Sequence, residues 1–454
     1  MIKQIFKTLI LLFCLVSLGL SAPKTPNASK GSSPKTPIAS KNTPFKHYEL
    51  KGEEEGPTLL VIGGIHGDEP GGFLAPAILA QHYTIKKGNV IVVPNLNPDS
   101  ILALKRGVYK DMNRKFAKIA PNDPDFDNVA QIKKMITDEK VDFIINLHDG
   151  HGFYREKWEN AIFNPRAWGQ TYVIDQKTLD SVRFGNLDEI AKQIEIKLNN
   201  GHLHYDFHIF GIRNTETRIK DEEQQNSLTF FAITHLKPAL AIETSKNIKE
   251  EDLKVYYQLI SIEALMEVLG ISYQRDFEIT REEVNKRIKD YGDLKINDNI
   301  TLSLSDLRSV INFTPLKPKD NKYEFSHPLG RIKTTKIGEE IYIGHKKIAT
   351  LKPDYFAMNC SVDGIWIERD KKEAEFVKFG ETIDYDKGFL VKEQKGVRIN
   401  IIGYAKKGII SEHNLYVPTQ EISTNYSLDR AKKIFRIEAY EGKNFCGMVN
   451  AKAP

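Results

Sequence analysis

The sequence is poor in cysteine and tryptophan, lacks an apolar run of transmembrane length, and has no large surplus of one charge. Its 454 residues include three cysteines, and no two of them form a Cys-x-x-Cys pair. A cysteine zinc site and a thioredoxin-like redox motif are therefore excluded. The mean hydropathy of −0.40 excludes a polytopic membrane protein. With 41% hydrophobic residues the chain has a globular composition, and its length predicts two or three domains.

The small positive net charge belongs to the N-terminal segment. The whole chain carries a formal charge of +5, but residues 1–43 hold six lysines and no acidic residue, so the remainder carries one net negative charge. A nucleic-acid-binding domain needs a basic face on its folded part. We therefore expect no nucleic-acid partner.

The first 21 residues are typical of a signal peptide. Lys3 and Lys7 precede a short apolar run over 9–18, and Gly19 and Ser21 are the small residues expected before a cleavage site. The alternative is an uncleaved anchor, although the run is short for a transmembrane helix. We expect the protein to be exported.

Residues 22–44 contain an imperfect repeat rich in proline, lysine, serine and threonine. Such residues bury little apolar surface, so this segment is predicted to be a disordered linker. It acts either as a plain spacer or as a cationic tether that gives weak association with an anionic membrane or wall.

Apolar runs and amphipathic segments alternate between residues 45 and 275. Strands are predicted over 59–62, 90–93, 141–147 and 238–242, and helices over 73–81, 127–140, 187–198 and 250–269. This alternation predicts an α/β domain with a mixed, mainly parallel sheet. Ligands bind such sheets beyond the carboxyl ends of the strands.

Three of these predicted strand ends carry residues that can bind a metal. His66 and Glu69 follow the first strand, and His148 follows the third. Two imidazoles and one carboxylate are typical of a hydrolytic zinc site with an open fourth position. Glu243 follows the last strand and could take a proton from the attacking water. Each motif alone is weak, because a lone histidine is often structural, but the four together predict a metal site.

The segment 94–116 adds an amide and two guanidinium groups. Asn113 and Arg114 are suited to bidentate binding of a carboxylate. Arg106 could stabilise the oxyanion of a tetrahedral intermediate. A solvated surface charge is the alternative role for either arginine.

Together these motifs resemble those of the carboxypeptidase A-like zinc metallocarboxypeptidases, in the same order along the chain. By this resemblance the zinc ligands are His66, Glu69 and His148. Arg106 would polarise the scissile carbonyl, and Glu243 would act as general base and then as general acid.

A closer similarity is to the periplasmic peptidoglycan DL-carboxypeptidases that set the shape of helical bacteria. It is carried by residues 65–69 and 148–154 and by the overall length. Some members have glutamine at the first ligand position, where this chain has His66. The similarity implies a periplasmic enzyme that removes meso-diaminopimelate from the muramyl tripeptide stem of peptidoglycan and leaves a dipeptide.

The resemblance also assigns residues to the substrate pocket. Asn113 and Arg114 would hold the terminal carboxylate of the substrate. Further candidate pocket residues are Arg155, Trp168 and Thr244, and Tyr205 is a candidate for a catalytic tyrosine. Trp168 could instead be a core residue.

From residue 276 onward the sequence pattern changes to short alternating runs separated by glycine and proline turns. It predicts two small β-rich domains of sandwich or barrel type over 276–350 and 351–454. Their role is scaffolding, or the binding of glycan or a partner protein. His327 and His413 are isolated, which indicates structural roles, and Cys360 and Cys446 either form a disulfide or are buried thiols.

Two alternative functions fit the same residues. An aspartoacylase-like amino-acid deacylase would share the metal ligands and the Asn-Arg pair. A non-catalytic cell-wall-binding protein would retain the site as a relict, although the complete ligand set argues against it. The oligomeric state is not predicted.

Overall fold

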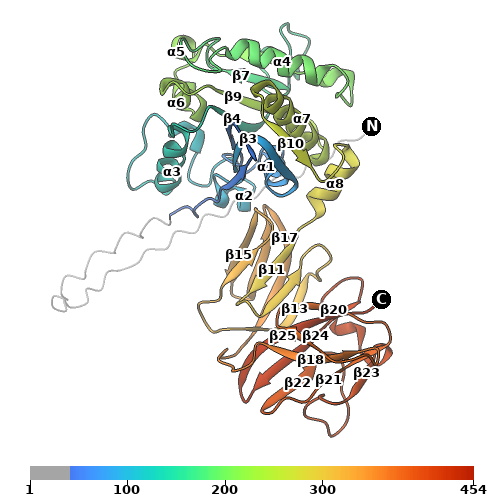
Figure 1. Ribbon diagram of the computed structural model, residues 1–454. Helices are drawn as coiled ribbons and strands as arrows, with labels where there is room; N and C mark the ends of the chain where they lie inside the picture. Colours follow the sequence, from blue (N-terminus) through green and yellow to red (C-terminus); the bar gives the residue numbers. More distant parts are fainter. Residues whose placement is uncertain (1–40) are drawn as a thin grey trace, which may run out of the picture. The chain divides into compact units, whose positions relative to one another are not determined.

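The computed structural model describes residues 41–454 (Figure 1), so the predicted signal peptide and most of the predicted linker lie outside the described residues. The last residues of that linker differ from the prediction. Asn42 is buried, and its side-chain amide donates hydrogen bonds to Asn97 Oδ1 and Asp125 Oδ1, each at 2.8 Å. Residues 41–44 therefore pack on the folded part of the chain.

The N-terminal part is built on an eight-stranded sheet with the order β1-β3-β2-β4-β9-β7-β8, and β10 also pairs with β3. These strands are β1 (Tyr48–Lys51), β2 (Glu54–Ile62), β3 (Tyr83–Val93), β4 (Phe143–Gly150), β7 (Thr171–Ile174), β8 (Gly211–Asn214), β9 (Ala239–Ser245) and β10 (Ser272–Arg275). The four central strands are parallel. Strands β1 and β10 pair antiparallel with β3, and β7 pairs antiparallel with β9 but parallel with β8. The predicted mixed sheet is confirmed.

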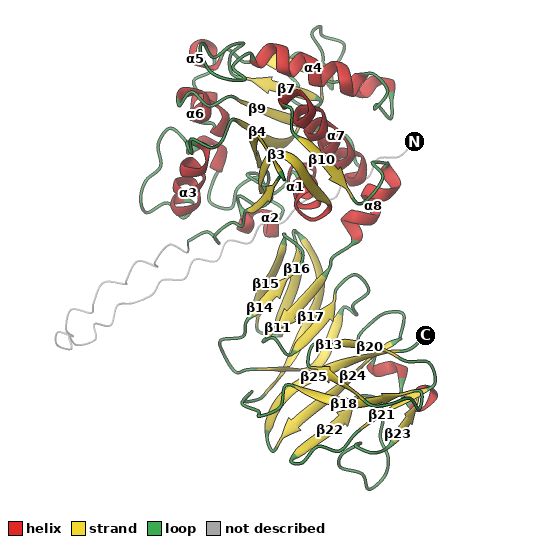
Figure 2. Ribbon diagram, viewed as in Figure 1, coloured by secondary structure: helices red, strands yellow, loops and turns green. Residues whose placement is uncertain are grey.

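The central strands are apolar on both faces because helices cover both faces of the sheet (Figure 2). Residues 59–62 at the end of β2 are fully buried. The helices are α1 (Pro70–His82), α2 (Pro98–Ala103), α3 (Phe126–Ile136), α4 (Leu187–Asn199), α5 (Thr217–Lys220), α6 (Leu228–Thr234), α7 (Glu251–Leu269) and α8 (Arg281–Lys289). Helix α7 packs against α1, α4 and α8, and α6 packs against β4 and β9.

The helix predicted over 127–140 is shorter than expected. Helix α3 stops at Ile136, where the Thr137 hydroxyl donates to the Lys133 carbonyl at 3.0 Å and competes with further helical bonds. Helix α7 ends as predicted, with Gly270 in the left-handed conformation (φ 80°). Among residues 41–454, no helix is both long enough and apolar enough to cross a membrane.

The C-terminal part is β-rich, as predicted, and forms four sheets with the orders β12-β11-β14, β13-β17-β16-β15, β19-β18-β21-β23 and β20-β25-β24-β22. The first two sheets contain β11 (Asp293–Ile296), β12 (Ile300–Ser303), β13 (Val310–Leu316), β14 (Tyr323–Phe325), β15 (Gly330–Thr335), β16 (Gly338–Ile343) and β17 (Lys346–Tyr355). The last two contain β18 (Gly364–Arg369), β19 (Glu375–Lys378), β20 (Thr382–Asp384), β21 (Gly388–Val391), β22 (Val397–Ile401), β23 (Tyr416–Pro418), β24 (Ile434–Glu441) and β25 (Asn444–Lys452).

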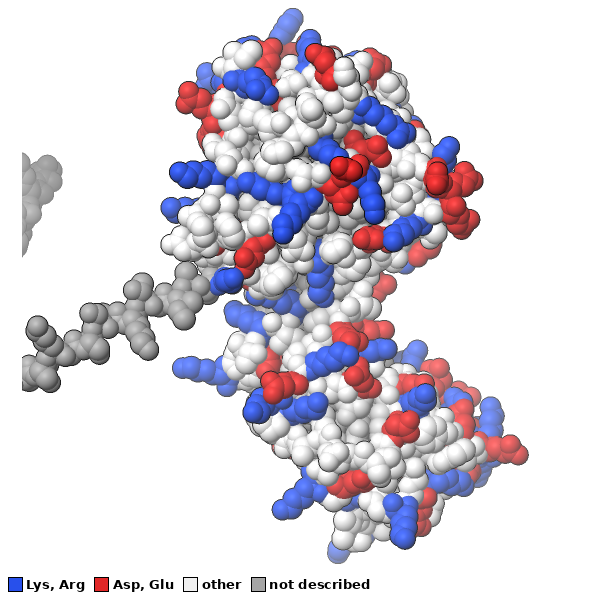
Figure 3. Space-filling view, turned by 60° about the vertical axis from the view of Figure 1, so that its left-hand side comes forward, with Lys and Arg blue, Asp and Glu red and all other residues white. Residues whose placement is uncertain are grey.

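The last two sheets enclose their own apolar core, to which β18, β21, β22, β24 and β25 all contribute buried side chains. Residues of β24 and β25 outside that core join the larger core of the chain. Tyr440 and Phe445 there pack edge-on and tilted against Phe356, with ring centroids 5.5 and 6.2 Å away. On the face in Figure 3, basic and acidic side chains are interspersed, which matches the near-neutral composition after residue 43.

Cys360 and Cys446 form a disulfide that joins two positions 86 residues apart in the sequence. The sequence left open whether these cysteines form a disulfide or are buried thiols, and the structure shows the disulfide. Because a cross-link over a long loop restricts the unfolded chain, we expect replacement of both cysteines by serine to lower the free energy of unfolding by about 4 kcal/mol. Thermal melts of the parent protein and of the double variant measure this loss of stability. Dithiothreitol should lower the melting temperature of the parent protein only, and equal shifts in both proteins would contradict the assignment.

Candidate active site

The four residues of the predicted metal site come together at one edge of the sheet. His66 lies in the loop after β2, and Glu69 directly precedes α1. His148 and Glu243 are paired across β4 and β9. Both lie inside their strands, rather than after the ends as predicted, because each strand continues for two more residues. The parallel register brings the side chains of neighbouring strands to the same level.

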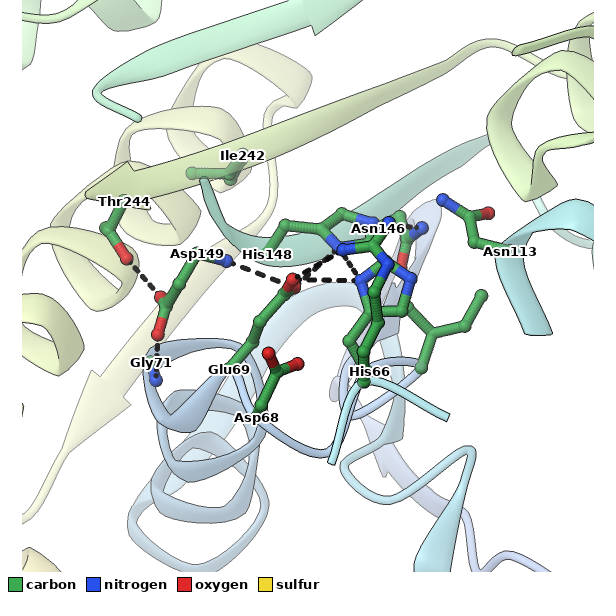
Figure 4. Close-up of polar contacts among 12 residues, drawn as sticks. His66, Asp68, Glu69, Gly71, Asn113, Asn146, His148, Asp149, Ile242 and Thr244 are labelled. Carbon is green, nitrogen blue, oxygen red and sulfur yellow. Dashed lines mark hydrogen bonds and ion pairs between the residues drawn. The ribbon is translucent and has the colours of Figure 1, made fainter. Parts of the chain in front are cut away.

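The imidazoles of His66 and His148 both turn Nδ1 toward Glu69 (Figure 4). His66 Nδ1 lies 3.0 Å from Glu69 Oε1, and His148 Nδ1 lies 2.8 Å from Glu69 Oε2. The two Nδ1 atoms are 3.2 Å apart, and all three side chains are buried. Two nitrogen donors and one carboxylate therefore converge on one small volume.

The far sides of both rings are held by other polar groups. His66 Nε2 lies 2.9 Å from Asp111 Oδ1, and His148 Nε2 lies 2.7 Å from the Asn146 side-chain amide. Asn146 Oδ1 is buried and makes no hydrogen bond within residues 41–454. With the Asn146 amide flipped, the His148 ring would donate Nε2–H to that oxygen and keep its Nδ1 lone pair for a cation. The donor set fits a divalent metal.

Glu243 is placed to act as a base. Its carboxylate lies beside Gly150, where a Cβ atom would come within 2.8 Å of Glu243 Oε2. Among the described residues we find no hydrogen bond to this carboxylate. Burial, together with the carboxylates of Glu69 and Asp149, raises the pKa of Glu243 well above its usual value. The Glu243 carboxylate therefore has a raised proton affinity, and no hydrogen-bond donor among the described residues occupies its oxygens.

Asp149 anchors the strand ends to α1 and α7. Its carboxylate accepts hydrogen bonds from Gly71 N (3.0 Å) and the Thr244 hydroxyl, and it lies 3.1 Å from Lys254 Nζ. Its own backbone N–H donates to Glu69 Oε2 at 3.2 Å. Thr244, predicted to line the pocket, is instead fully buried behind Asp149. Its hydroxyl donates to the Asp149 carboxylate and so helps to hold that carboxylate in place.

A cleft of about 320 Å³ opens over the metal site. Besides the metal-site residues, its lining includes Arg106, Asn113, Arg114, Trp168, Asp221, Glu223, Gln224 and Lys246. The Trp168 ring is stacked by Arg213, whose guanidinium carbon lies 3.9 Å from the ring centroid. Trp168 therefore forms a rigid wall of this cleft.

Arg155, predicted to line the pocket, and Tyr205, the candidate catalytic tyrosine, lie elsewhere. The Arg155 guanidinium donates to the carbonyls of Tyr154 (2.7 Å) and Phe207 (2.6 Å), and it does not line the cleft. Tyr205 packs its exposed ring against Phe207 and His208, also outside the cleft. Both residues lie in loops, and the spacing of residues in the sequence does not indicate how these loops pack together.

Asp111, which sequence reasoning missed, connects the candidate metal site to the groups predicted to bind substrate. Besides contacting His66, its carboxylate accepts from Arg106 Nε (3.0 Å) and from Asn113 N (2.8 Å). Arg106 Nη1 also lies 3.3 Å from Glu69 Oε1. Asp111 directly precedes the Met112–Arg114 turn of 3₁₀ helix, so one carboxylate orients several site groups at once.

The predicted carboxylate-binding pair lies at one end of the cleft. Asn113 Oδ1 accepts a hydrogen bond from Leu228 N at 2.9 Å, which leaves its NH₂ group for a ligand. Arg114 donates Nε to Glu223 (2.8 Å) and Nη1 to the Asn113 carbonyl (3.1 Å). No hydrogen bond within residues 41–454 engages Arg114 Nη2. This pair offers donors to an anionic group.

Lys246 is a further cleft residue that the sequence did not reveal. Its Nζ lies 2.7 Å from Asp68 Oδ2 and 3.4 Å from Glu69 Oε1. The nearby carboxylates raise the pKa of Lys246 despite its partial burial. Its position three residues after Glu243 was the available signal, because the end of β9 carries both residues to the cleft.

Comparisons with known proteins agree with this geometry. A family model described as "carboxypeptidase controlling helical cell shape catalytic" matches residues 42–289, and one described as "C-terminal domain of metallo-carboxypeptidase" matches 358–453. The apo crystal structure of cell shape determinant Csd4 from Helicobacter pylori has a TM-score of 0.85 at 32% identity, covering 90% of this chain and 100% of that chain. The tripeptide-bound form gives 0.84 with the same identity and coverage.

A curated relative of another activity is also similar. The N-alpha-acetyl-L-2,4-diaminobutyric acid deacetylase of Halomonas elongata is 36% identical over 148 residues, which is 28% of this chain and 42% of that protein. This chain thus spans less than half of that relative, whereas the catalytic family model covers more than half of this chain. The chain belongs to the family of metallo-carboxypeptidases that control helical cell shape.

Proposed function

We propose that this protein is a zinc-dependent peptidoglycan DL-carboxypeptidase of the periplasm. It removes the terminal meso-diaminopimelate from the muramyl tripeptide and leaves the dipeptide. The buried set of His66, Glu69 and His148 with Glu243 opposite carries this proposal. Csd4, which is described as a D,L-carboxypeptidase and has been solved with tripeptide and with mDAP, supports the substrate class.

Zinc is the metal that best fits the donors. Two imidazole nitrogens and one carboxylate are typical zinc ligands, whereas calcium and magnesium prefer oxygen ligands throughout. When bound, zinc supplies Lewis-acid chemistry that stabilises negative charge at the attacked carbonyl. His66, Glu69 and His148 would hold it, with Asp111 and Asn146 fixing the two rings.

The chain's own groups supply the remaining chemistry. Glu243 takes the proton from the attacking water and returns it to the leaving amine. Arg106 places positive charge where the carbonyl oxygen becomes an oxyanion. Asn113 and Arg114 bind the terminal carboxylate, so that the last peptide bond is the one presented to Glu243.

The experiment that tests this proposal is product analysis. Purified protein with zinc is incubated with defined muropeptides carrying tri-, tetra- and pentapeptide stems, and masses are followed by liquid chromatography. We expect the tripeptide alone to lose one diaminopimelate, because the carboxylate-binding pair defines the chain end. Failure to cleave any of the three stems with zinc bound would contradict the proposal.

A second candidate is an amino-acid deacylase, which the similarity to the diaminobutyric acid deacetylase favours. The match to Csd4 covers 90% of the chain and so includes the β-rich part, whereas the deacetylase match covers 28%. N-acetylated amino acids added to the same assay separate the two functions. Their hydrolysis without cleavage of any muropeptide would favour the deacylase.

A further inference from the structure

A second and larger cleft lies in the β-rich part of the chain. Its volume is about 540 Å³, against about 320 Å³ for the cleft over the metal site, and the two share no residue. Strands β13, β22 and β24 and the segment 425–428 contribute to its walls. Its size falls in the range of small-molecule binding sites.

Aromatic side chains stand exposed at this second cleft. Phe313 is 70% exposed and Tyr426 is 55% exposed, and Tyr404 is partly buried beside them. Phe313 lies where the pairing of β13 with β17 shifts register, and its backbone is left-handed (φ 52°). This conformation is costly for an aromatic residue and persists only where the surroundings enforce it. The exposed ring of Phe313 at the cleft is therefore held in one place, where a ligand can pack on it.

Two arginines brace the segments that carry these rings. Arg436 is buried and donates Nη1 to the Phe313 carbonyl (3.1 Å) and Nη2 to the Asn312 carbonyl (3.4 Å). Arg308 donates to the carbonyls of residues 424–425 at 3.0 and 2.6 Å, next to Tyr426. Each guanidinium fixes one aromatic-bearing segment, so the cleft is organised before any ligand enters.

The floor of the cleft contains buried polar atoms that lack a full set of partners. Glu438 is 3% exposed, accepts a hydrogen bond from the Tyr440 hydroxyl (2.7 Å) and pairs with Arg436 Nη1 at 3.2 Å. Arg436 Nε has no hydrogen-bond partner within residues 41–454, and Glu438 Oε1 has only the ion pair with Arg436 Nη1. Buried polar atoms are normally satisfied, so Arg436 Nε and the remaining lone pair of Glu438 Oε1 leave room for a polar ligand or ordered water at the floor.

The charged side chains of the second cleft indicate which kind of ligand it can bind. Its carboxylates, Asp354, Glu412 and Glu438, outnumber its arginines, and both arginines already bind backbone carbonyls. Peptide stems of the proposed substrate carry several carboxylates, so they would be repelled. N-acetylglucosamine is neutral, and so is N-acetylmuramic acid while its lactyl carboxyl is in amide linkage. Both sugars have amide and hydroxyl groups for hydrogen bonds and flat apolar faces that pack on aromatic rings.

We propose that this second cleft binds the N-acetylated amino sugars of a glycan strand, and that it holds the strand whose peptide stems enter the catalytic cleft. The substrate side of this inference rests on the proposed function. A tether of this kind raises the effective concentration of stems at the metal site without adding contacts to them.

The test is equilibrium binding of two probes to the full chain carrying Glu243→Gln, so that no turnover occurs. The probes are a β-1,4-linked N-acetylglucosamine tetramer and stem-free glycan strands whose lactyl carboxylates are capped as amides. We expect both to bind, and Phe313→Gly and Tyr426→Ala each to weaken binding about tenfold. Phe313→Gly should fold normally, because glycine tolerates φ 52°. Trp366→Ala, at an exposed aromatic residue outside the cleft, is the matched control.

Several outcomes would overturn the inference. Absence of glycan binding would do so. Binding of the tetramer without the amide-capped strands, or equal losses in Trp366→Ala, would do so as well. Binding of a free tripeptide stem that Phe313→Gly abolishes would assign the cleft to peptide instead. If glycan binding holds while the parent protein cleaves no muropeptide, the proposed function fails and this site stands.

Discussion

Replacement of Glu243 by glutamine is expected to lower kcat about 1,000-fold while metal content stays at the level of the parent protein. Glutamine keeps the volume of the side chain but cannot accept the proton of the attacking water. Glu243 is paired with His148 across the strands but is not one of the three clustered metal-binding side chains, so the metal should be retained. Muropeptide turnover and metal analysis measure the two effects separately.

Glu222→Gln is the matched control for this experiment. Glu222 is exposed and does not line the cleft, so the same change of charge there should leave turnover within about twofold. Turnover in Glu243→Gln within tenfold of the parent would refute the assignment of the base. Loss of metal in that variant would instead make Glu243 a ligand.

The candidate metal ligands and Glu243 could be predicted because their positions follow from the predicted strands. His148 and Glu243 each come after a short apolar run that fits a buried strand, and parallel neighbours share one edge. The sequence could not show that both strands extend two residues further. Those residues, Asp149 with Gly150 and Thr244 with Ser245, are polar or small, and only tertiary contacts extend the ladder through them.

The supporting residues could not be predicted in the same way. Asp111 reaches His66 across 45 residues of sequence, and Lys246 reaches Asp68 across 178, so no local pattern connects them. Arg155 has a type suited to a carboxylate pocket, but its loop folds onto the Phe207 carbonyl. The sequence shows which side chains can bind a carboxylate or a metal. It does not show where each of them points, because that depends on how the loops pack.

In the β-rich part, too, the sequence indicates local structure but not how distant segments pack together. Alternating runs predicted most of its strands, but the order of four sheets depends on long-range pairing, such as parallel β13 with β17 and parallel β20 with β25. The second cleft arises only from that pairing. Its key residues, Phe313 and Arg436, are 123 positions apart in the sequence.

His148→Ala is expected to have the second large effect, which is loss of the metal itself. Removal of one of three protein ligands should weaken metal binding by more than about 100-fold, since changes to residues behind the ligands already cost 10- to 100-fold. Metal analysis after gel filtration should find little bound zinc, and muropeptide cleavage should disappear with it. Circular dichroism and thermal melting show whether the variant folds.

Asn146→Ala separates loss of a ligand from loss of its support. Asn146 contacts His148 Nε2 at 2.7 Å and is on the side of the ring away from Glu69. We expect weaker zinc binding, by about 10- to 100-fold, with activity restored when zinc is added in excess. His148→Ala should not be restored, because the nitrogen donor is gone. Equal rescue of both variants would show that His148 is not a ligand, and no rescue of Asn146→Ala would show that the amide does more than orient the ring.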